Sequence, residues 1–157
     1  MKNSLQIDSL DKKILSILTK NARIPFLEVA RACDISGAAV HQRVQRLTKL
    51  GIISGSQFNV DPKKLGFKTC AFVGIFLDNA ALFNNVSEKL VEISEITQIH
   101  YITGQWAMFI EVYTRDNEHL RHVLADKIQS IKAISRTETF ISLDVLTDRQ
   151  MSFLEDE

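Results

Sequence analysis

Glutamine and arginine side chains recur along residues 36–51, SGAAVHQRVQRLTKLG, and the stretch GAAVHQRVQRLTK contains no acidic residue. Arginine and glutamine pair bidentately with guanine and adenine edges in the DNA major groove. At ~100° per residue, Val40, Val44 and Leu47 fall on one helix face and leave the polar residues opposite. Small residues at the start of this helix would let it approach the bases closely. The residues predicted to contact DNA are Ser36, Gly37, Ala38, Ala39, His41, Gln42, Arg43, Gln45 and Arg46.

Two helical patterns precede this segment, over residues 8–21 and 26–33. In the second pattern Leu27 should face inward with its apolar neighbours. Ser36 is placed to cap the third helix, because its hydroxyl can accept from a backbone N–H of the first turn. Two helices joined by a short turn, with the second well capped, predict a helix-turn-helix.

Residues 52–60, IISGSQFNV, read as a short hairpin that follows Gly51 at the end of the third helix. With Ser54 and Ser56 this hairpin would form a wing against the DNA backbone. The alternative is a solvated basic helix in a generic three-helix domain. The missing acids, the serine cap and the short turn favour DNA binding.

The charge is distributed unevenly along the 157 residues, although the net charge is zero. Residues 1–60 carry nine Lys or Arg against four Asp or Glu, whereas residues 61–157 carry ten against fifteen. A basic N-terminal segment and an acidic C-terminal segment indicate an anion-binding domain joined to a domain that does not bind anions.

Composition favours a cytoplasmic protein with no membrane partner. The longest uninterrupted apolar run, CAFVGIFL at residues 70–77, is too short to span a bilayer. The start, MKNSLQID, lacks the apolar segment of a signal peptide. Cys33 and Cys70 lie far apart in apolar runs, which is typical of reduced packing thiols.

The spacing of apolar residues changes in the second half of the chain. This half follows a linker candidate, DPKKLGF, at residues 61–67. We therefore predict a winged helix-turn-helix domain at 1–60 and a second domain at 68–157. Its order is β-α-β-β-α-β, the ferredoxin-like pattern, which makes the whole chain an α+β protein. The predicted strands are 69–78, 96–103, 107–114 and 134–146, and the predicted helices are 82–93, with Leu82 facing inward, and 117–131.

Two helices can cover only one face of a four-stranded sheet. The opposite face is predicted to be apolar as well, so we expect a second copy of the chain to cover it. It would carry several of Cys70, Phe72, Phe76, Phe109 and Tyr113.

Other chemistries find little support in the sequence. His119 and His122 have a spacing that metals tolerate, but no cysteine or third histidine accompanies them. His100 and Glu111 flank a turn without a nucleophile motif, and no nucleotide-binding glycine motif occurs. We therefore expect no metal, no cofactor and no enzymatic activity.

The turn between the second and third predicted strands raises a question of its own. Two apolar runs meet at Thr103–Gly104, and Gln105 and Trp106, the only tryptophan, follow directly. A plain hairpin does not need its largest side chain at the turn.

Most of the chain resembles the Lrp/AsnC, or feast/famine, family of transcription regulators, and in particular its asparagine-responsive branch. The resemblance implies a winged helix-turn-helix joined to a βαββαβ ligand-binding (RAM) domain. It also implies homodimers that form through the sheets and often assemble to an octamer. It covers about residues 8–146 and rests on LDKKILSILTKNAR, LEVARACDIS, VHQRVQRLTKLGIISG, DPKKLGF, HYITGQW, IQSI and SRTETFISL.

In this family amino acids bind where dimers meet and change DNA binding, and the resemblance makes the turn one wall of that site. Gly104 would allow a close approach, so that neighbouring N–H groups bind a carboxylate, while Trp106 would form an apolar lid. Gln129 would read an amide. The predicted effector-binding residues are Tyr101, Thr103, Gly104, Gln105, Trp106, Gln129, Thr137 and Thr139, of which the two last threonines would come from a facing subunit.

The sequence departs from the family at Ala107, where many members carry an acid that can pair with a cationic group. Burying a cation without a partner is costly, so a neutral amino acid such as asparagine is favoured as the effector. Two alternatives stay open. One is a member without an effector, in which Trp106 packs between dimers, and the other is an architectural DNA-compacting protein of the same fold.

Overall fold

The computed structural model describes residues 7–151. By its internal contacts the chain divides into two compact units, Val60–Leu146 and the remainder, so that the stretch from Thr147 groups with the N-terminal unit. The predicted boundaries at 1–60, 61–67 and 68–157 stay a prediction. Within residues 7–151, no helix is long and apolar enough to cross a membrane.

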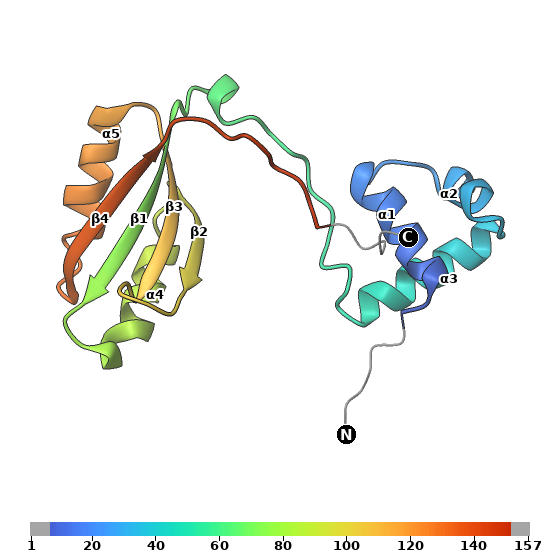
Figure 1. Ribbon diagram of the computed structural model, residues 1–157, viewed down its shortest axis with the longest axis horizontal. Coiled ribbons are helices and arrows are strands. Elements are labelled where there is room, and N and C mark those ends of the chain that lie inside the picture. The colour runs from blue at the N-terminus through green and yellow to red at the C-terminus, as the bar shows by residue number, and fades with distance from the viewer. Residues whose placement is uncertain (1–6, 152–157) are drawn as a thin grey trace. The chain divides into compact units, whose positions relative to one another are not determined.

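The N-terminal unit contains three helices, α1 (Ser9–Lys20), α2 (Phe26–Cys33) and α3 (Gly37–Lys49) (Figure 1). Each helix contributes to one small core, in which Ile14, Val29 and Val40 are completely buried. Leu27 does not belong to this core, because 58% of its surface is exposed, and its predicted inward position is wrong. The α2 helix thus buries Val29, Ala30 and Cys33 instead.

Local capping interactions fix the helix boundaries. Asp8 and Asp11 form a capping box at the start of α1, in which each side chain accepts from the backbone N–H of the other residue. Asp34 ends α2 in a left-handed conformation, with φ of 55°. The Ser36 hydroxyl oxygen accepts from the Ala39 N–H at 3.1 Å, which confirms the predicted cap of α3.

The hairpin predicted over residues 52–60 is absent from the described part of the chain, and that prediction is wrong. The N–H groups of Ile52 and Ile53 both donate to the Leu47 carbonyl, and no strand begins between them and Thr69. A lone two-stranded hairpin is marginal in water, and among residues 7–151 the packing leaves Phe58 70% exposed. The Arg23 guanidinium lies 4.1 Å from the centre of the Phe58 ring.

The second unit is a four-stranded antiparallel sheet in the order β2-β3-β1-β4, which confirms the predicted βαββαβ pattern. The strand β4 covers the first nine residues of the predicted run 134–146 and ends before Leu143, which is almost fully exposed. The elements are β1 (Thr69–Leu77), α4 (Phe83–Val91), β2 (Ile96–Tyr101), β3 (Met108–Thr114), α5 (Asn117–His122) and β4 (Ile134–Ser142).

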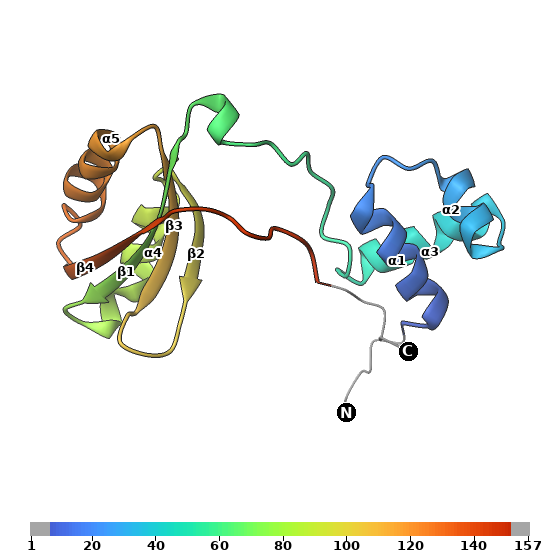
Figure 2. The same ribbon diagram turned by 45° about the horizontal axis from the view of Figure 1, so that its top comes forward.

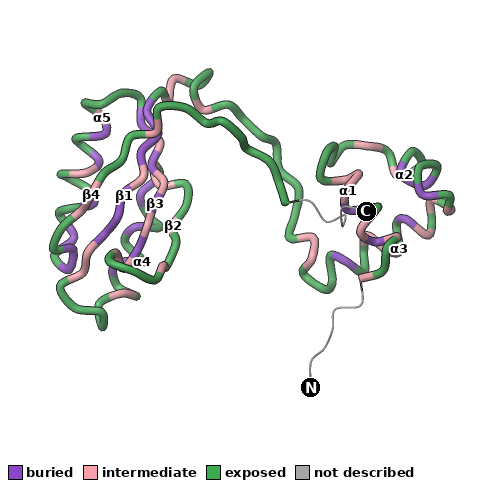
Figure 3. The backbone as a smooth tube through the Cα atoms, viewed as in Figure 1, coloured by how far each residue is buried: buried purple, intermediate pink, exposed green. Residues whose placement is uncertain are grey.

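Both helices of this unit lie on the same face of the sheet (Figures 1 and 2). Alternate residues of the two central strands, among them Val73 and Ile110, meet Leu90 of α4 and Val123 after α5 in one core. The burial pattern in Figure 3 follows this arrangement, since β1 and β3 are more buried than the edge strands. Leu82, predicted to face this core, is 41% exposed because it belongs to a 3₁₀ turn ahead of α4.

The helix predicted over 117–131 changes its geometry halfway. After α5 the chain continues as a π-helical segment, Val123–Ile128, and the Gln129 N–H donates to the Leu124 carbonyl at 2.8 Å. Such wide turns occur inside helices, frequently at functional sites. The segment keeps Val123 and Ile128 buried while it brings Gln129 to the surface.

The opposite face of the sheet carries no helix, and we call it the helix-free face. It presents Phe72, Phe109 and Phe140 from three adjacent strands, and the rings of Phe72 and Phe109 stack with centres 5.7 Å apart. Phe140 is half exposed. Glu111 lies on the same face, where its carboxylate accepts from the Thr97 hydroxyl at 2.6 Å.

Candidate functional site

The α3 helix presents a polar surface built from its exposed residues. Val40 and Leu47 are completely buried, as the helical periodicity predicts, and this orientation turns Gln42 and Gln45 outward. His41 is also exposed, and its ring meets the edge of the Phe26 ring at 6.0 Å between centres.

The two arginines of α3 are engaged with the first helix. Arg43 donates to Asp8 at 2.7 Å and to Asp11 at 2.8 Å, and Arg46 also donates to Asp11. The Asp11 side chain is completely buried, although it is a carboxylate. We call Asp8, Asp11, Arg43 and Arg46 the α1–α3 charge cluster. The predicted contacts of both arginines with DNA stay a prediction.

Hydrogen bonds within this cluster favour the charged forms of Asp8 and Arg43. The hydrogen bond from Arg43 lowers the pKa of the Asp8 carboxyl, and the Asp11 backbone N–H acts in the same direction. The hydrogen bonds to Asp8 and Asp11 raise the pKa of Arg43 above its ordinary value. Asp8 and Arg43 therefore stay ionised across the physiological pH range.

The turn between β2 and β3 lies at the surface, with Thr103, Gly104 and Gln105 all exposed. Gly104 has φ of 120°, a backbone conformation that favours glycine, and no atom lies within 4 Å of the position that a Cβ would take. Tyr101 is exposed as well, and its ring packs against the Phe83 ring with centres 4.5 Å apart.

Trp106 leaves this turn and lies on the helix-free face. Its indole covers Gly74 so closely that a Cβ there would be 2.5 Å from the indole Cε2. Its Nε1–H donates to Glu138 at 3.0 Å, and the ring packs against Phe109 and Phe140. The indole thus covers the sheet within one chain, and its predicted role as a lid over an effector stays a prediction.

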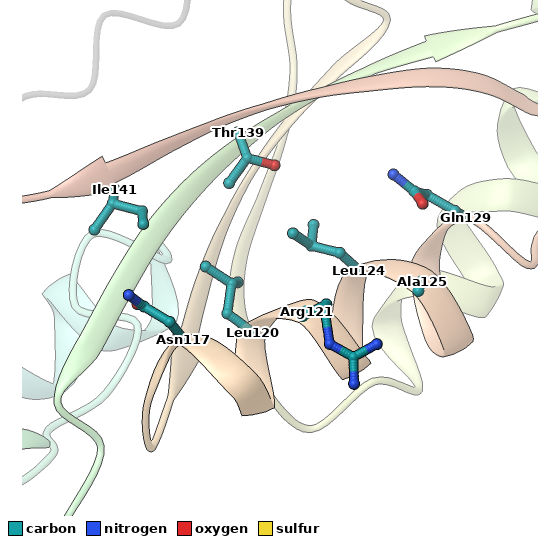
Figure 4. Close-up of a pocket in the computed structure, with 8 residues that line it drawn as sticks. All are labelled: Asn117, Leu120, Arg121, Leu124, Ala125, Gln129, Thr139 and Ile141. Atoms are coloured by element: carbon teal, nitrogen blue, oxygen red, sulfur yellow. The ribbon is translucent and has the colours of Figure 1, made fainter.

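A groove of about 470 Å³ lies between α5 and β4, and it contains two of the predicted effector residues (Figure 4). Leu120 and Leu124 point from the helix toward the strand, while Thr139 points back toward the helix. The described residues that line it are Asn117, Leu120, Arg121, Leu124, Ala125, Gln129, Thr139 and Ile141, and none of them is acidic.

Gln129 and Thr137 interact directly at one end of β4. The Gln129 side-chain NH₂ donates to the Thr137 hydroxyl at 2.8 Å, which leaves the Gln129 carbonyl oxygen as an acceptor. Thr137 and Thr139 lie opposite Ile75 and Val73 of β1, on the face that the helices cover.

One chain therefore does not gather the predicted effector residues in one pocket. The exposed turn joins β2 to β3, and Trp106 reaches Glu138 of β4 on the helix-free face. The pair formed by Gln129 and Thr137 lies beside β4 on the face that the helices cover. Asn117 and Arg121 also line the groove and are not among the predicted effector residues. The signal that could have indicated them is their spacing of four residues on a helix that lies beside a strand with alternating residues.

The histidines of α5 have partners other than a metal. His119 Nδ1 accepts from the Arg115 N–H at 3.2 Å, and its Nε2 lies 3.3 Å from Glu95 Oε1. Burial alone would raise the pKa of Glu95. The hydrogen bonds from Lys127, at 2.7 and 2.9 Å, together with a backbone hydrogen bond, the Lys127 charge and the Ser94 hydroxyl, outweigh burial and lower this pKa. Residues 7–151 contain no group of three metal-ligating side chains.

Both units match known protein families. Residues 7–54 match winged helix-turn-helix DNA-binding domains, and residues 70–151 match the Lrp/AsnC ligand binding domain. Regulatory protein AsnC of Haemophilus influenzae is 42% identical over 137 residues, which are 87% of this chain and 91% of that protein. Regulatory protein AsnC of Escherichia coli is 41% identical over 143 residues, 91% of this chain and 93% of that protein.

Solved structures agree with these matches. The structure of E. coli AsnC superposes with a TM-score of 0.89 at 38% identity, over 93% of this chain and 98% of that one. A feast or famine regulatory protein from M. tuberculosis, complexed with L-methionine, gives a TM-score of 0.86 at 25% identity, over 92% and 98% of the two chains.

A helix-turn-helix followed by a ligand-binding βαββαβ domain defines a ligand-responsive, DNA-binding transcription regulator and not an enzyme. The chain belongs to the Lrp/AsnC family, and its second unit is the amino-acid-binding domain of that family.

Proposed function

We propose that this regulator responds to a neutral amino acid, with asparagine as the first candidate, bound where two copies of the chain meet. The arrangement of the predicted effector residues supports this proposal. The turn around Gly104 joins β2 to β3, and the pair formed by Gln129 and Thr137 lies beside β4. We expect a second copy of the chain to complete a single site that uses both sets.

The turn offers a place for the α-carboxylate of the effector. With φ of 120°, Gly104 orients the neighbouring backbone N–H groups in a way that most residues would not permit. Exposed N–H groups of this kind bind anions, and the Thr103 hydroxyl can add a further donor.

The groove beside β4 offers a place for the side chain of the effector. Gln129 donates to Thr137, so its carbonyl oxygen can accept from the amide of an asparagine. No acidic residue occurs in the groove lining or in the turn from Tyr101 to Ala107. A lysine side chain would therefore lose its hydration without gaining a counter-charge, which disfavours cationic effectors.

The helix-free face gives separate support for the assembly of chains that this proposal requires. Phe72, Phe109, Phe140 and Trp106 form a continuous aromatic surface across three strands, of which Phe140 is half exposed. A second copy of the chain would remove this surface from water. Dimers formed in this way would leave the turns and grooves outside for contacts between dimers, as in an octamer.

Isothermal titration calorimetry of the full chain with each of the twenty amino acids tests the effector. We expect asparagine to bind, and Gln129→Ala to weaken binding by about 1–1.5 kcal/mol, or roughly five- to tenfold. Ser130→Ala, at the exposed neighbouring position, serves as the matched control and should bind as the unaltered chain does.

The outcomes separate the parts of the proposal. Binding of a different neutral amino acid would replace asparagine and keep the effector site, whereas no binding by any amino acid would refute the effector. Light scattering on the same samples reports the mass of the assembly. A monomer at every concentration would refute the site shared between chains.

Selection from a pool of random DNA duplexes with the full chain tests sequence-specific DNA binding. An enriched sequence that binds far more tightly than random duplex, at one salt concentration, supports a regulator with defined operators. Equal affinity for both would favour an architectural protein instead.

A further inference from the structure

Asp11 occupies an unusual position for a carboxylate. Its side chain is completely buried in the N-terminal unit, and it lies on α1, outside the predicted DNA-contacting helix. It accepts from Arg43, from Arg46 and from the Asp8 backbone N–H. A buried carboxylate is tolerated when its charge is paired and its oxygens accept hydrogen bonds, and both conditions hold here.

The two arginines bind Asp11 from the same side of α3. They are three residues apart, so their side chains are neighbours on the helix surface. Because both guanidinium groups reach a single carboxylate, a rotation of α3 about its axis would break at least one of these bonds. The cluster therefore fixes which residues α3 turns toward solvent.

The same contacts reduce the positive charge and the hydrogen-bond donors that the two arginines can offer to DNA. Asp8 and Asp11 supply two negative charges against the two positive charges of Arg43 and Arg46. An arginine that left Asp11 to bind a guanine would deprive a buried carboxylate of a partner. Gln42 and Gln45 carry no such cost, since both are exposed on α3. Glutamine can bind an adenine edge bidentately.

We propose that Asp11 is a positioning residue for DNA recognition, which holds Arg43 and Arg46 against α1, and that Gln42 and Gln45 read the bases. This assignment extends the DNA-binding site beyond α3 to a buried residue of α1. It also changes the part expected for Arg46, from a base-reading side chain to one that orients the helix.

Asp11→Asn in the full chain tests the positioning role. Asparagine keeps the shape and one acceptor oxygen but removes the charge, so Asp11 no longer neutralises the arginines, although Asp8 still binds Arg43. Each additional phosphate contact steepens the slope of log affinity against log salt by ~0.9, and we expect a gain of about one such contact. We expect tighter binding to random duplex, a steeper slope and a smaller preference for the duplex enriched by selection.

Glu28→Gln provides a matched control, because it removes the same charge from an exposed position on α2 of the same unit. It should leave the salt slope and the sequence preference unchanged. A purely structural role of Asp11 predicts weaker binding to both duplexes without a steeper slope. An unchanged slope and preference in a folded Asp11→Asn protein would also overturn the proposal.

Two further variants keep the proposal testable if Asp11→Asn fails to fold. Arg46→Lys retains a charge that can pair with Asp11 but cannot bind guanine bidentately. Repeating the selection with this variant should return the same sequence, and loss of a preferred guanine would show that Arg46 reads a base. Gln45→Ala should relax the preference at one base pair while it retains the affinity for random duplex, and an unchanged preference would refute its role as a reader.

Discussion

The contact between Trp106 and Gly74 gives the sharpest test of how the turn is tied to the sheet. In Gly74→Ala the new Cβ would lie 2.5 Å from the indole Cε2 and 2.6 Å from Cδ2 and Nε1. Real Cβ atoms do not approach other heavy atoms so closely. The central strand β1 is fixed by pairing on both sides, so the indole must move.

The size of the effect follows from what the indole loses. Displacing the indole breaks its hydrogen bond to the Glu138 carboxylate. A hydrogen bond to a charged acceptor contributes about 1.5–3 kcal/mol. Each lost aromatic contact, with Phe109 and with Phe140, adds about 0.5–1.5 kcal/mol. Replacing glycine by alanine in a strand stabilises the folded state by about 0.5–1 kcal/mol, which offsets part of this loss. Because Trp106 is partly exposed and can swing outward, we expect a net loss near the lower end, about 2 kcal/mol.

Two measurements on the same protein check this expectation. Trp106 is the only tryptophan, so its fluorescence reports this one site, and emission should shift to longer wavelength as the indole meets water. Urea unfolding followed by circular dichroism gives the free energy of unfolding. Gly37→Ala is the control, because no atom lies within 4 Å of its Cβ position, and it should leave the emission unchanged.

A double-mutant cycle identifies the cause of the loss. In a Trp106→Ala background the steric conflict is absent, so Gly74→Ala should cost nothing or stabilise slightly. An equal loss in both backgrounds, or unchanged emission in the single variant, would refute the contact as described.

Three further predictions concern other parts of the chain. Ser36→Ala should lower the free energy of unfolding by about 1 kcal/mol in urea, because α3 loses its N-cap. Gly104→Ala should cost about 1–2 kcal/mol through its positive φ and abolish any calorimetric response to amino acids while DNA binding persists. The pKa of Glu95 is lower in the folded chain than its ordinary 4.5, so its stabilising effect should be present above that pH. It should be lost as the pH falls through the folded pKa, and Glu95→Gln should remove this part of the acid dependence measured by urea unfolding.

Local signals predict much of this fold. The ends of α2 and α3 follow from Pro25, from the Ser36 cap and from apolar spacing, because these depend on residues within one or two turns. The order of strands and helices in the second unit follows from a change of apolar period in the same way. Predictions fail where a segment needs a distant partner. The 52–60 hairpin is the clearest case, since periodicity cannot show that the described part of the chain leaves this segment exposed.

The candidate sites show the same difference between features set by local sequence and features set by distant contacts. The polar face of α3 is visible in the sequence, but its pairing with Asp11 joins residues more than thirty positions apart, and no pattern indicates it. Trp106 is conspicuous in the sequence for its size, whereas its position over Gly74 depends on the register between β1 and β3. The partner of Gln129 could be found only after β4 was placed beside α5.

The π-helical segment after α5 also bears on how the family tolerates changes in chain length. A wide turn holds one residue more than the α-helical turn it replaces. Deleting one residue from Val123–Ile128 would therefore restore an ordinary helix without breaking the chain's path. Every position beyond it, Gln129 included, would then keep its phase with Thr137, because the wide turn absorbs the extra residue locally. A relative shortened by one residue here would keep the fold and the pairing of Gln129 but lose one side chain from the segment that lines the groove.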